Sequence, residues 1–220
     1  MLSEIVALLQ SRPTFFVDLL IEHLGISGLS ILCAASFGLV LGVVISEYEK
    51  LASPVLAFIS IVYTVPSISM LGFLIPFSGI GNATAIITLT IYALLPMVRN
   101  THSGISTIDE TVLEVAKGMG STDWQILYKI KIPLALPIIM SGLRNMAVMT
   151  IALTGIASFI GAGGLGVAVY RGITTNNTAM TLVGSLGIAL LAFGADFLLA
   201  ALERVFRRQK QTKILRGNLP

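Results

Sequence analysis

Five long apolar stretches account for most of this 220-residue chain. The first three contain no charged residue, the fourth contains only Arg144 and the fifth only Asp196. A helix needs about 20 mostly apolar residues to cross a bilayer, so the sequence predicts an all-α integral membrane protein of about five transmembrane helices. With 55% hydrophobic residues, an ordinary soluble domain is excluded. The stretches are residues 25–45, 53–76, 80–98, 134–159 and 178–202.

The remaining residues predict one membrane domain with two flanking segments. We expect the transmembrane domain at residues 25–203, with a cytoplasmic loop at 99–133 between the third and fourth spans. Residues 1–24 have amphipathic apolar spacing interrupted by acidic residues and Pro13. This pattern indicates helices at the outer membrane surface rather than a cleavable signal. Residues 204–220 form a basic cytoplasmic tail that suits contact with anionic lipid.

Lysine and arginine placement predicts the orientation. If loop 99–133 is cytoplasmic, its side of the membrane carries eleven of the 14 basic residues, and the opposite side carries only Arg12 and Arg171. Because basic residues are enriched in cytoplasmic loops, we expect the N-terminus outside and the C-terminus in the cytoplasm. The eleven are Lys50, Arg99, Lys117, Lys129, Lys131, Arg204, Arg207, Arg208, Lys210, Lys213 and Arg216.

The most distinctive motif follows the third apolar stretch. Although only 11% of the chain is charged, residues 109–131 include seven charged side chains. Residues 114–133 have the sequence EVAKGMGSTDWQILYKIKIP, with Glu, Ala, Gly and Pro at fixed spacing. The pattern resembles the EAA loop of permease subunits of ABC importers, from which Val115 and Ile132 are mild departures.

The local chemistry of this loop predicts two short helices around a turn. Leu113–Met119 suits a helix, Gly120 a left-handed stop, and Ser121 or Thr122 a cap for the next helix. We expect Pro133 to end that second helix before the next apolar stretch. Such a pair of helices forms a knob that can enter a groove on a cytosolic partner.

The resemblance implies that this partner is an ATP-binding cassette ATPase. The alternative is an ordinary charged loop between membrane helices. The residues that the resemblance assigns to ATPase coupling are Glu114, Ala116, Gly118, Gly120, Trp124, Ile130 and Pro133.

The second apolar stretch carries a proline near its middle. Pro66 removes a helical hydrogen bond, and Thr64 and Ser67 supply nearby hydroxyls. Broken helices near the midplane often line transport pathways, so Tyr63, Thr64, Pro66 and Ser67 are candidates for the translocation path. A proline kink without a transport role is the alternative.

Several further segments resemble the osmoprotectant branch of these permeases. This branch imports glycine betaine, choline, carnitine and related quaternary amines. The resemblance covers most of the chain from Tyr63 onward. It rests on YTVPS at 63–67, IPFSGIGN at 75–82, LLPMVRNT at 94–101 and ASFIGAGGLG at 157–166.

A glycine cluster follows the fourth stretch. Gly161, Gly163 and Gly166 satisfy the G-x-G-x-x-G pattern, which indicates a dinucleotide site only between a strand and a helix. After a membrane helix, that interpretation is rejected. We expect Gly161, Gly163, Gly164 and Gly166 to form a close-packing external turn, as part of a gate or a docking surface.

Four residues inside the spans suggest helix–helix contacts. Arg144 and Asp196 are costly in a bilayer; they either pair across the last two spans or contact substrate directly. Gly38 and Gly42 form a G-x-x-x-G pattern that suits either packing within the chain or a dimer contact.

The sequence predicts transport rather than catalysis. It offers no acid–base, nucleophile or metal-ligand constellation, so we expect no metal and no cofactor on this chain. The resemblance implies a permease subunit in a bacterial or archaeal cytoplasmic (inner) membrane. Its implied partners are ABC ATPases that bind ATP and Mg, an external substrate-binding protein, and a second permease copy or a paralogous permease. A permease for methionine or another amino acid, and an ion-coupled secondary transporter, are the alternatives.

Overall fold

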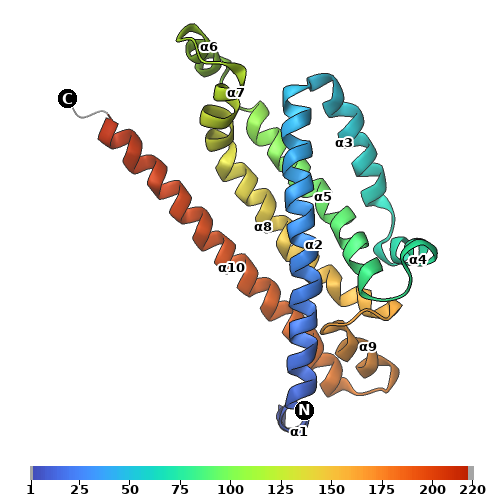
Figure 1. Ribbon diagram of the computed structural model, residues 1–220. Coiled ribbons are helices and arrows are strands. Elements are labelled where there is room, and N and C mark those ends of the chain that lie inside the picture. The colour runs from blue at the N-terminus through green and yellow to red at the C-terminus, as the bar shows by residue number, and fades with distance from the viewer. Residues whose placement is uncertain (1, 218–220) are drawn as a thin grey trace.

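In the structure, a computed structural model, all secondary structure in the described part of the chain is helical (Figure 1). It describes the backbone of residues 2–217 and the side chains of residues 3–204. The elements are α1 (Leu2–Ser11), α2 (Pro13–Glu47), α3 (Glu49–Thr64), α4 (Ser67–Ser78), α5 (Asn82–Ser106), α6 (Glu110–Gly118), α7 (Asp123–Ile126), the π-helical turn η1 (Leu127–Lys131), α8 (Ile132–Ala157), the 3-10 turn η2 (Ser158–Ile160), α9 (Gly166–Thr174) and α10 (Thr178–Gly217).

Four helical segments are long and apolar enough to cross a membrane: Pro13–Glu47, Asn82–Ser106, Asp123–Ile160 and Thr178–Arg204. A fifth candidate is the pair α3 and α4, which meet at an angle of 97°. The expectation of an all-α protein with about five spans is therefore confirmed. The expected single span at residues 53–76 is a broken one, because Pro66 cannot continue the ladder of helical hydrogen bonds.

Successive long helices run in alternating directions between two ends of the molecule (Figure 1). α1 and α9 lie at one end, near the N-terminus. α6 and α7 lie at the opposite end, together with the junction between α2 and α3. The charged loop that contains α6 and α7 is thus far from the glycine-rich turn that precedes α9.

The core is built around α5, which packs against both α2 and α8. One cluster joins Ala34 of α2, Ala93 and Met97 of α5, and Ala135 and Met146 of α8. The alanines in this cluster allow the helix backbones to approach closely.

The G-x-x-x-G stripe of α2 faces α5. A Cβ atom added at Gly38 would lie 2.8 Å from Met97 Cβ, and one added at Gly42 would lie 2.5 Å from Thr101 Cβ. Both glycines are buried. Of the two alternatives for this motif, the structure shows packing within the chain.

The N-terminal segment is joined to the first span by one continuous helix. α2 continues from Pro13 through residue 24 into the first span, so the expected boundary at 24/25 is not a helix end. Phe16 and Leu19 pack against Leu165 and Met180, which covers their apolar stripe within the chain. The side chains of the predicted basic tail beyond residue 204 lie outside the described residues.

Candidate functional site

The polar segment, defined here as residues 109–133, begins with a capped helix. Asp109 precedes α6, and its carboxylate accepts a hydrogen bond of 2.9 Å from the backbone N–H of Thr111. Because this bond favours the charged carboxylate, it holds the pKa of Asp109 below its ordinary value. The cap satisfies one of the N–H groups that α6 leaves free at its start.

The turn after α6 is a Schellman motif centred on Gly120. Gly120 has φ +84°, in the left-handed region. Its N–H donates to the carbonyl of Lys117 (2.9 Å), and the N–H of Ser121 donates to the carbonyl of Ala116 (3.1 Å). The glycine stop expected from the sequence is confirmed, since the left-handed conformation is costly for residues with a Cβ atom.

The second short helix begins with a capping box. The Thr122 hydroxyl accepts the N–H of Gln125 (3.3 Å), while the Gln125 side chain accepts the N–H of Thr122 (3.0 Å). Both bonds satisfy N–H groups that the helix leaves free at its start. Of the two caps expected from the sequence, Thr122 is the one used.

The expectation that Pro133 ends this helix is wrong. α7, η1 and α8 form one helical segment from Asp123 to Ile160, with Pro133 in the first turn of α8. The π-helical turn ends at Lys131, two residues before the proline. In a regular α-helix, the proline ring would clash with the carbonyl four residues earlier. The wider π-helical turn leaves room for that ring.

Side chains of the polar segment divide into an inner and an outer set. Ala116 and Ile126 are each 2% exposed, and the helices that carry them, α6 and α7, pack against each other. Glu114, Gly118, Gly120 and Pro133 are exposed, and Ile130 is half-buried. Exposed large apolar side chains lie among them: Val112, Val115, Met119, Trp124 and Tyr128. Exposed apolar side chains rimmed by polar groups are typical of a docking surface.

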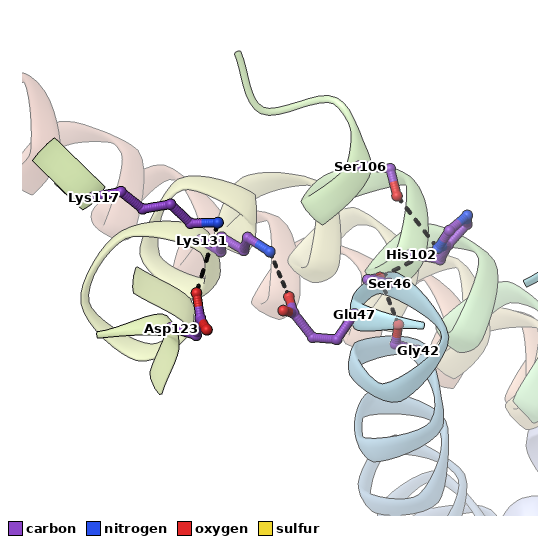
Figure 2. Close-up of polar contacts among 8 residues, drawn as sticks. All are labelled: Gly42, Ser46, Glu47, His102, Ser106, Lys117, Asp123 and Lys131. Atoms are coloured by element: carbon purple, nitrogen blue, oxygen red, sulfur yellow. Dashed lines mark hydrogen bonds and ion pairs between the residues drawn. The ribbon is translucent and has the colours of Figure 1, made fainter. Parts of the chain in front are cut away.

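A small cavity of about 150 Å³ lies where the polar segment meets the end of α2. Lys131 of η1 reaches Glu47 at the end of α2, with 2.6 Å between Nζ and Oε1 (Figure 2). Lys117 and Asp123 are 3.7 Å apart across the turn from α6 to α7. The cavity is lined by Glu47, Glu110, Leu113, Glu114, Lys117, Asp123, Ile126 and Lys131.

Sequence reasoning missed Glu47 as a member of this site. It is separated from Lys131 by 84 residues, and only the packing of α2 beside the polar segment brings them together. An acidic residue at the end of an apolar span was the only indication available. From the sequence alone, Glu47 is equally consistent with a solvated residue at the membrane boundary.

The candidate path residues lie at the break between α3 and α4. The Tyr63 and Tyr92 rings have centroids 5.7 Å apart, and the Tyr92 hydroxyl donates to the carbonyl of Val65. The Tyr63 hydroxyl contacts Met149 Sδ at 3.2 Å, and the Thr64 hydroxyl donates to the carbonyl of Ile61 (2.7 Å). Pro66 is exposed and Ser67 begins α4. Tyr92 of α5 thus hydrogen-bonds to the backbone at the break between α3 and α4.

The glycine-rich turn is bound to α2 and α5 by its backbone. Gly163 N–H donates to Asn82 Oδ1 (2.9 Å), and Gly164 N–H donates to Glu22 Oε2 (3.0 Å). Gly161 and Gly164 have φ values of +76° and +90°. Gly166 lies directly against the backbone of Gly155, where a Cβ atom has no room. The four glycines therefore form a closely packed turn.

Arg144 and Asp196 lie in direct contact between α8 and α10. Arg144 Nη2 donates to Asp196 Oδ2 at 2.6 Å, and Arg144 Nε donates to Oδ1. Both side chains are about one-third exposed. The structure thus brings this pair together, while the polar segment, the α3–α4 break and the glycine turn remain three separate places.

Over the described residues, no three His, Cys, Asp or Glu side chains lie where they could hold a metal ion together. His23 is buried, with Nε2 3.0 Å from the carbonyl of Ile151, and His102 lies near Ser46. Each histidine therefore has polar contacts with neighbouring helices.

Comparison with known proteins supplies a family. Residues 34–208 match the family described as binding-protein-dependent transport system inner membrane component. The match includes four of the five expected apolar stretches in full, most of the first one, and the entire polar segment.

Curated relatives match nearly the whole chain. A choline transport system permease protein of Bacillus subtilis is 38% identical over 213 residues, which cover 96% of this chain and 94% of the relative. A carnitine transport permease protein of Listeria monocytogenes is 37% identical, with 96% of both chains covered. An osmoprotectant import permease protein of Salmonella typhimurium is 40% identical, covering 87% of this chain and 91% of the relative.

Solved structures match the fold. A chain from the MetNI methionine ABC transporter in inward-facing conformations has a TM-score of 0.82 at 24% identity. The match covers 89% of this chain and 98% of that chain. A chain of an amino acid ABC transporter has a TM-score of 0.74 at 19% identity, covering 90% of this chain and 97% of the other. At these identities the likeness concerns the fold alone.

Proposed function

The chain belongs to the family of inner membrane components of binding-protein-dependent transport systems, and on that premise we propose that it is the permease subunit of an ATP-driven importer for osmoprotectants. The proposed solutes are quaternary amines such as glycine betaine, choline and carnitine. The observation that carries the solute class is the match to choline, carnitine and osmoprotectant permeases at 37–40% identity.

The polar segment is the proposed contact with the ATPase. Glu114 is exposed at the rim of the cavity beside α2, where its carboxylate is available to a basic side chain of the ATPase. Trp124, 73% exposed, and Met119, 76% exposed, supply apolar area that a soluble partner would cover. The Gly120 motif and the Thr122 cap give these side chains a defined arrangement.

In the proposed mechanism, ATP binding and hydrolysis on the partner move the polar segment. This movement tilts the helices between inward-facing and outward-facing states as largely rigid bodies. The orientation follows from the basic residues, with the polar segment and the C-terminus in the cytoplasm and the N-terminus outside. This chain supplies the path, and ATP and Mg belong to the ATPase.

The other groups have roles consistent with this cycle. Tyr63, Thr64, Pro66 and Ser67 line the path at the α3–α4 break, where the aromatic faces suit a quaternary ammonium ion. The turn at Gly161, Gly163, Gly164 and Gly166 forms part of the external gate or of the surface for the binding protein. A second permease, identical or paralogous, completes the translocator.

Transport by the purified assembly tests this function. The chain is reconstituted into liposomes with its ATPase, second permease and binding protein, and uptake of labelled choline, carnitine and glycine betaine is measured with and without internal ATP. We expect ATP-dependent uptake of at least one of these solutes, without competition by methionine. Uptake of methionine alone would support an amino-acid permease instead. Uptake driven by an ion gradient without ATP would support a secondary transporter.

A further inference from the structure

Two consecutive residues at the end of α2 make contacts with different parts of the molecule (Figure 2). Glu47 binds Lys131 of η1 at 2.6 Å. Ser46 Oγ lies 3.2 Å from His102 Nδ1 in the last turns of α5 and donates to the Gly42 carbonyl at 2.7 Å. The end of α2 is therefore attached both to the polar segment and to α5.

The Glu47–Lys131 pair is shielded from solvent more than the other ion pair of the polar segment. The Lys131 and Glu47 side chains are 17% and 30% exposed, whereas those of Lys117 and Asp123 are 64% and 90% exposed. Ion pairs on a fully exposed surface contribute little because water competes with both partners. The geometry thus favours Glu47–Lys131 as the structurally significant pair.

α2 and α5 have little freedom to slide past one another at this level. Gly42 approaches Thr101 so closely that an added Cβ atom would lie 2.5 Å from the threonine Cβ. Gly38 makes a similarly close approach to Met97 one turn earlier. A displacement of the end of α2 would consequently carry α5 with it, because packed interfaces of this kind resist continuous deformation.

We propose that Glu47 and Lys131 are positioning residues that join the polar segment to the α2–α5 pair, so that movement of the segment by the ATPase moves both helices as one body. The inference rests on the proposed function and adds a route by which ATPase motion reaches the core. Lys131 lies one residue before α8, and so the same movement reaches α8 directly through the chain.

A charge exchange tests the pair. In the reconstituted assembly, Glu47→Lys and Lys131→Glu are each expected to lower the number of solute molecules moved per ATP hydrolysed by roughly threefold or more. The double variant E47K/K131E restores the ratio, because the opposite charges again face each other. Glu49→Lys and Lys50→Glu make the same charge changes at exposed positions outside the polar segment and leave the ratio unchanged. Wild-type coupling in both single variants, or no recovery in the double variant, would overturn the proposal.

A crosslink gives a second test that does not require charge reversal. Cys33 is the single cysteine of the chain, so Cys33→Ser provides a background for Glu47→Cys and Lys131→Cys. A bifunctional thiol reagent with the span of a Lys–Glu pair then joins the two positions. If they move as one body, crosslinked transporters retain uptake. Loss of uptake on crosslinking, with recovery after cleavage of the reagent, would show that the two positions separate during transport and would overturn the proposal.

The two proposals fail in different ways. If the wild-type assembly hydrolyses ATP and imports solute but the charge exchange and crosslink give the contrary results, only the coupling route is wrong. If the wild-type chain neither retains an ATPase nor transports with ATP, the proposed function is wrong, and the coupling route with it.

Discussion

Arg144 of α8 and Asp196 of α10, which are 52 residues apart in sequence, meet side by side with two parallel hydrogen bonds. Each charge would be costly alone in a membrane span, whereas a paired guanidinium and carboxylate satisfy one another. The contact adds a polar link between α10 and α8. The two helices also pack against each other, and α10 packs against α9 as well. We interpret the pair as structural.

A double-mutant cycle tests that interpretation. Arg144→Ala and Asp196→Ala each leave one charge without its partner, so each is expected to lower the Tm of the purified protein. The double variant should lose less than the sum of the two, because it leaves no isolated charge. The Tm of Arg144→Lys should lie between those of the wild type and Arg144→Ala, since lysine keeps the charge but cannot make both parallel bonds. Fully additive losses in Tm and uptake would contradict a structural pair.

Gly120→Val should uncouple transport while leaving the chain inserted in the membrane. The φ of +84° at this position costs a residue with a Cβ atom about 1–2 kcal/mol, and more for a β-branched one. The Schellman turn would shift, and with it Trp124 and Glu114. ATPase association and uptake are the measurements. Gly28→Ala is the control, because Gly28 is helical, lies outside the polar segment, and a Cβ atom there meets nothing within 4 Å. Wild-type uptake by Gly120→Val would argue against the coupling role.

Gly42→Ala should destabilise the α2–α5 contact. The added methyl group would overlap Thr101 in a closely packed interface, at an expected cost of about 1–3 kcal/mol. Thermal unfolding in detergent measures the effect. Gly28→Ala adds the same group on the same helix, where nothing lies within 4 Å, and should be neutral or slightly stabilising. Equal Tm values for the two variants would show that the interface relaxes freely.

Tyr92→Phe should weaken the break between α3 and α4. It removes the hydroxyl that donates to the Val65 carbonyl, which regular helical bonding leaves free before Pro66. The expected loss is about 1 kcal/mol, because the acceptor left without this bond is only partly buried. Tyr63→Phe is the control for the unfolding temperature, because its hydroxyl donates to the weak acceptor Met149 Sδ. Unfolding temperature and solute uptake together report whether the break affects stability, transport or both; an unchanged Tm in Tyr92→Phe would contradict the assigned hydrogen bond.

The sequence by itself determined the features that depend on local chemistry. Apolar stretches of sufficient length predict the spans, since a helix satisfies its own backbone in lipid. Gly120 and Thr122 predict the turn and cap of the polar segment, because both depend on contacts within a few residues. The family follows from the same motif together with its surroundings.

Only the tertiary structure decided which distant groups meet. Glu47 with Lys131, Tyr92 with Val65, and Gly164 with Glu22 are contacts across several helices, and no spacing along the chain encodes them. Pro133 shows the same limit. Local sequence rules predict that it ends the helix, but the π-helical turn before it accommodates the proline ring and the helix continues. Side-chain partners in a helical bundle are selected by how the helices pack, and that packing is a property of the whole chain.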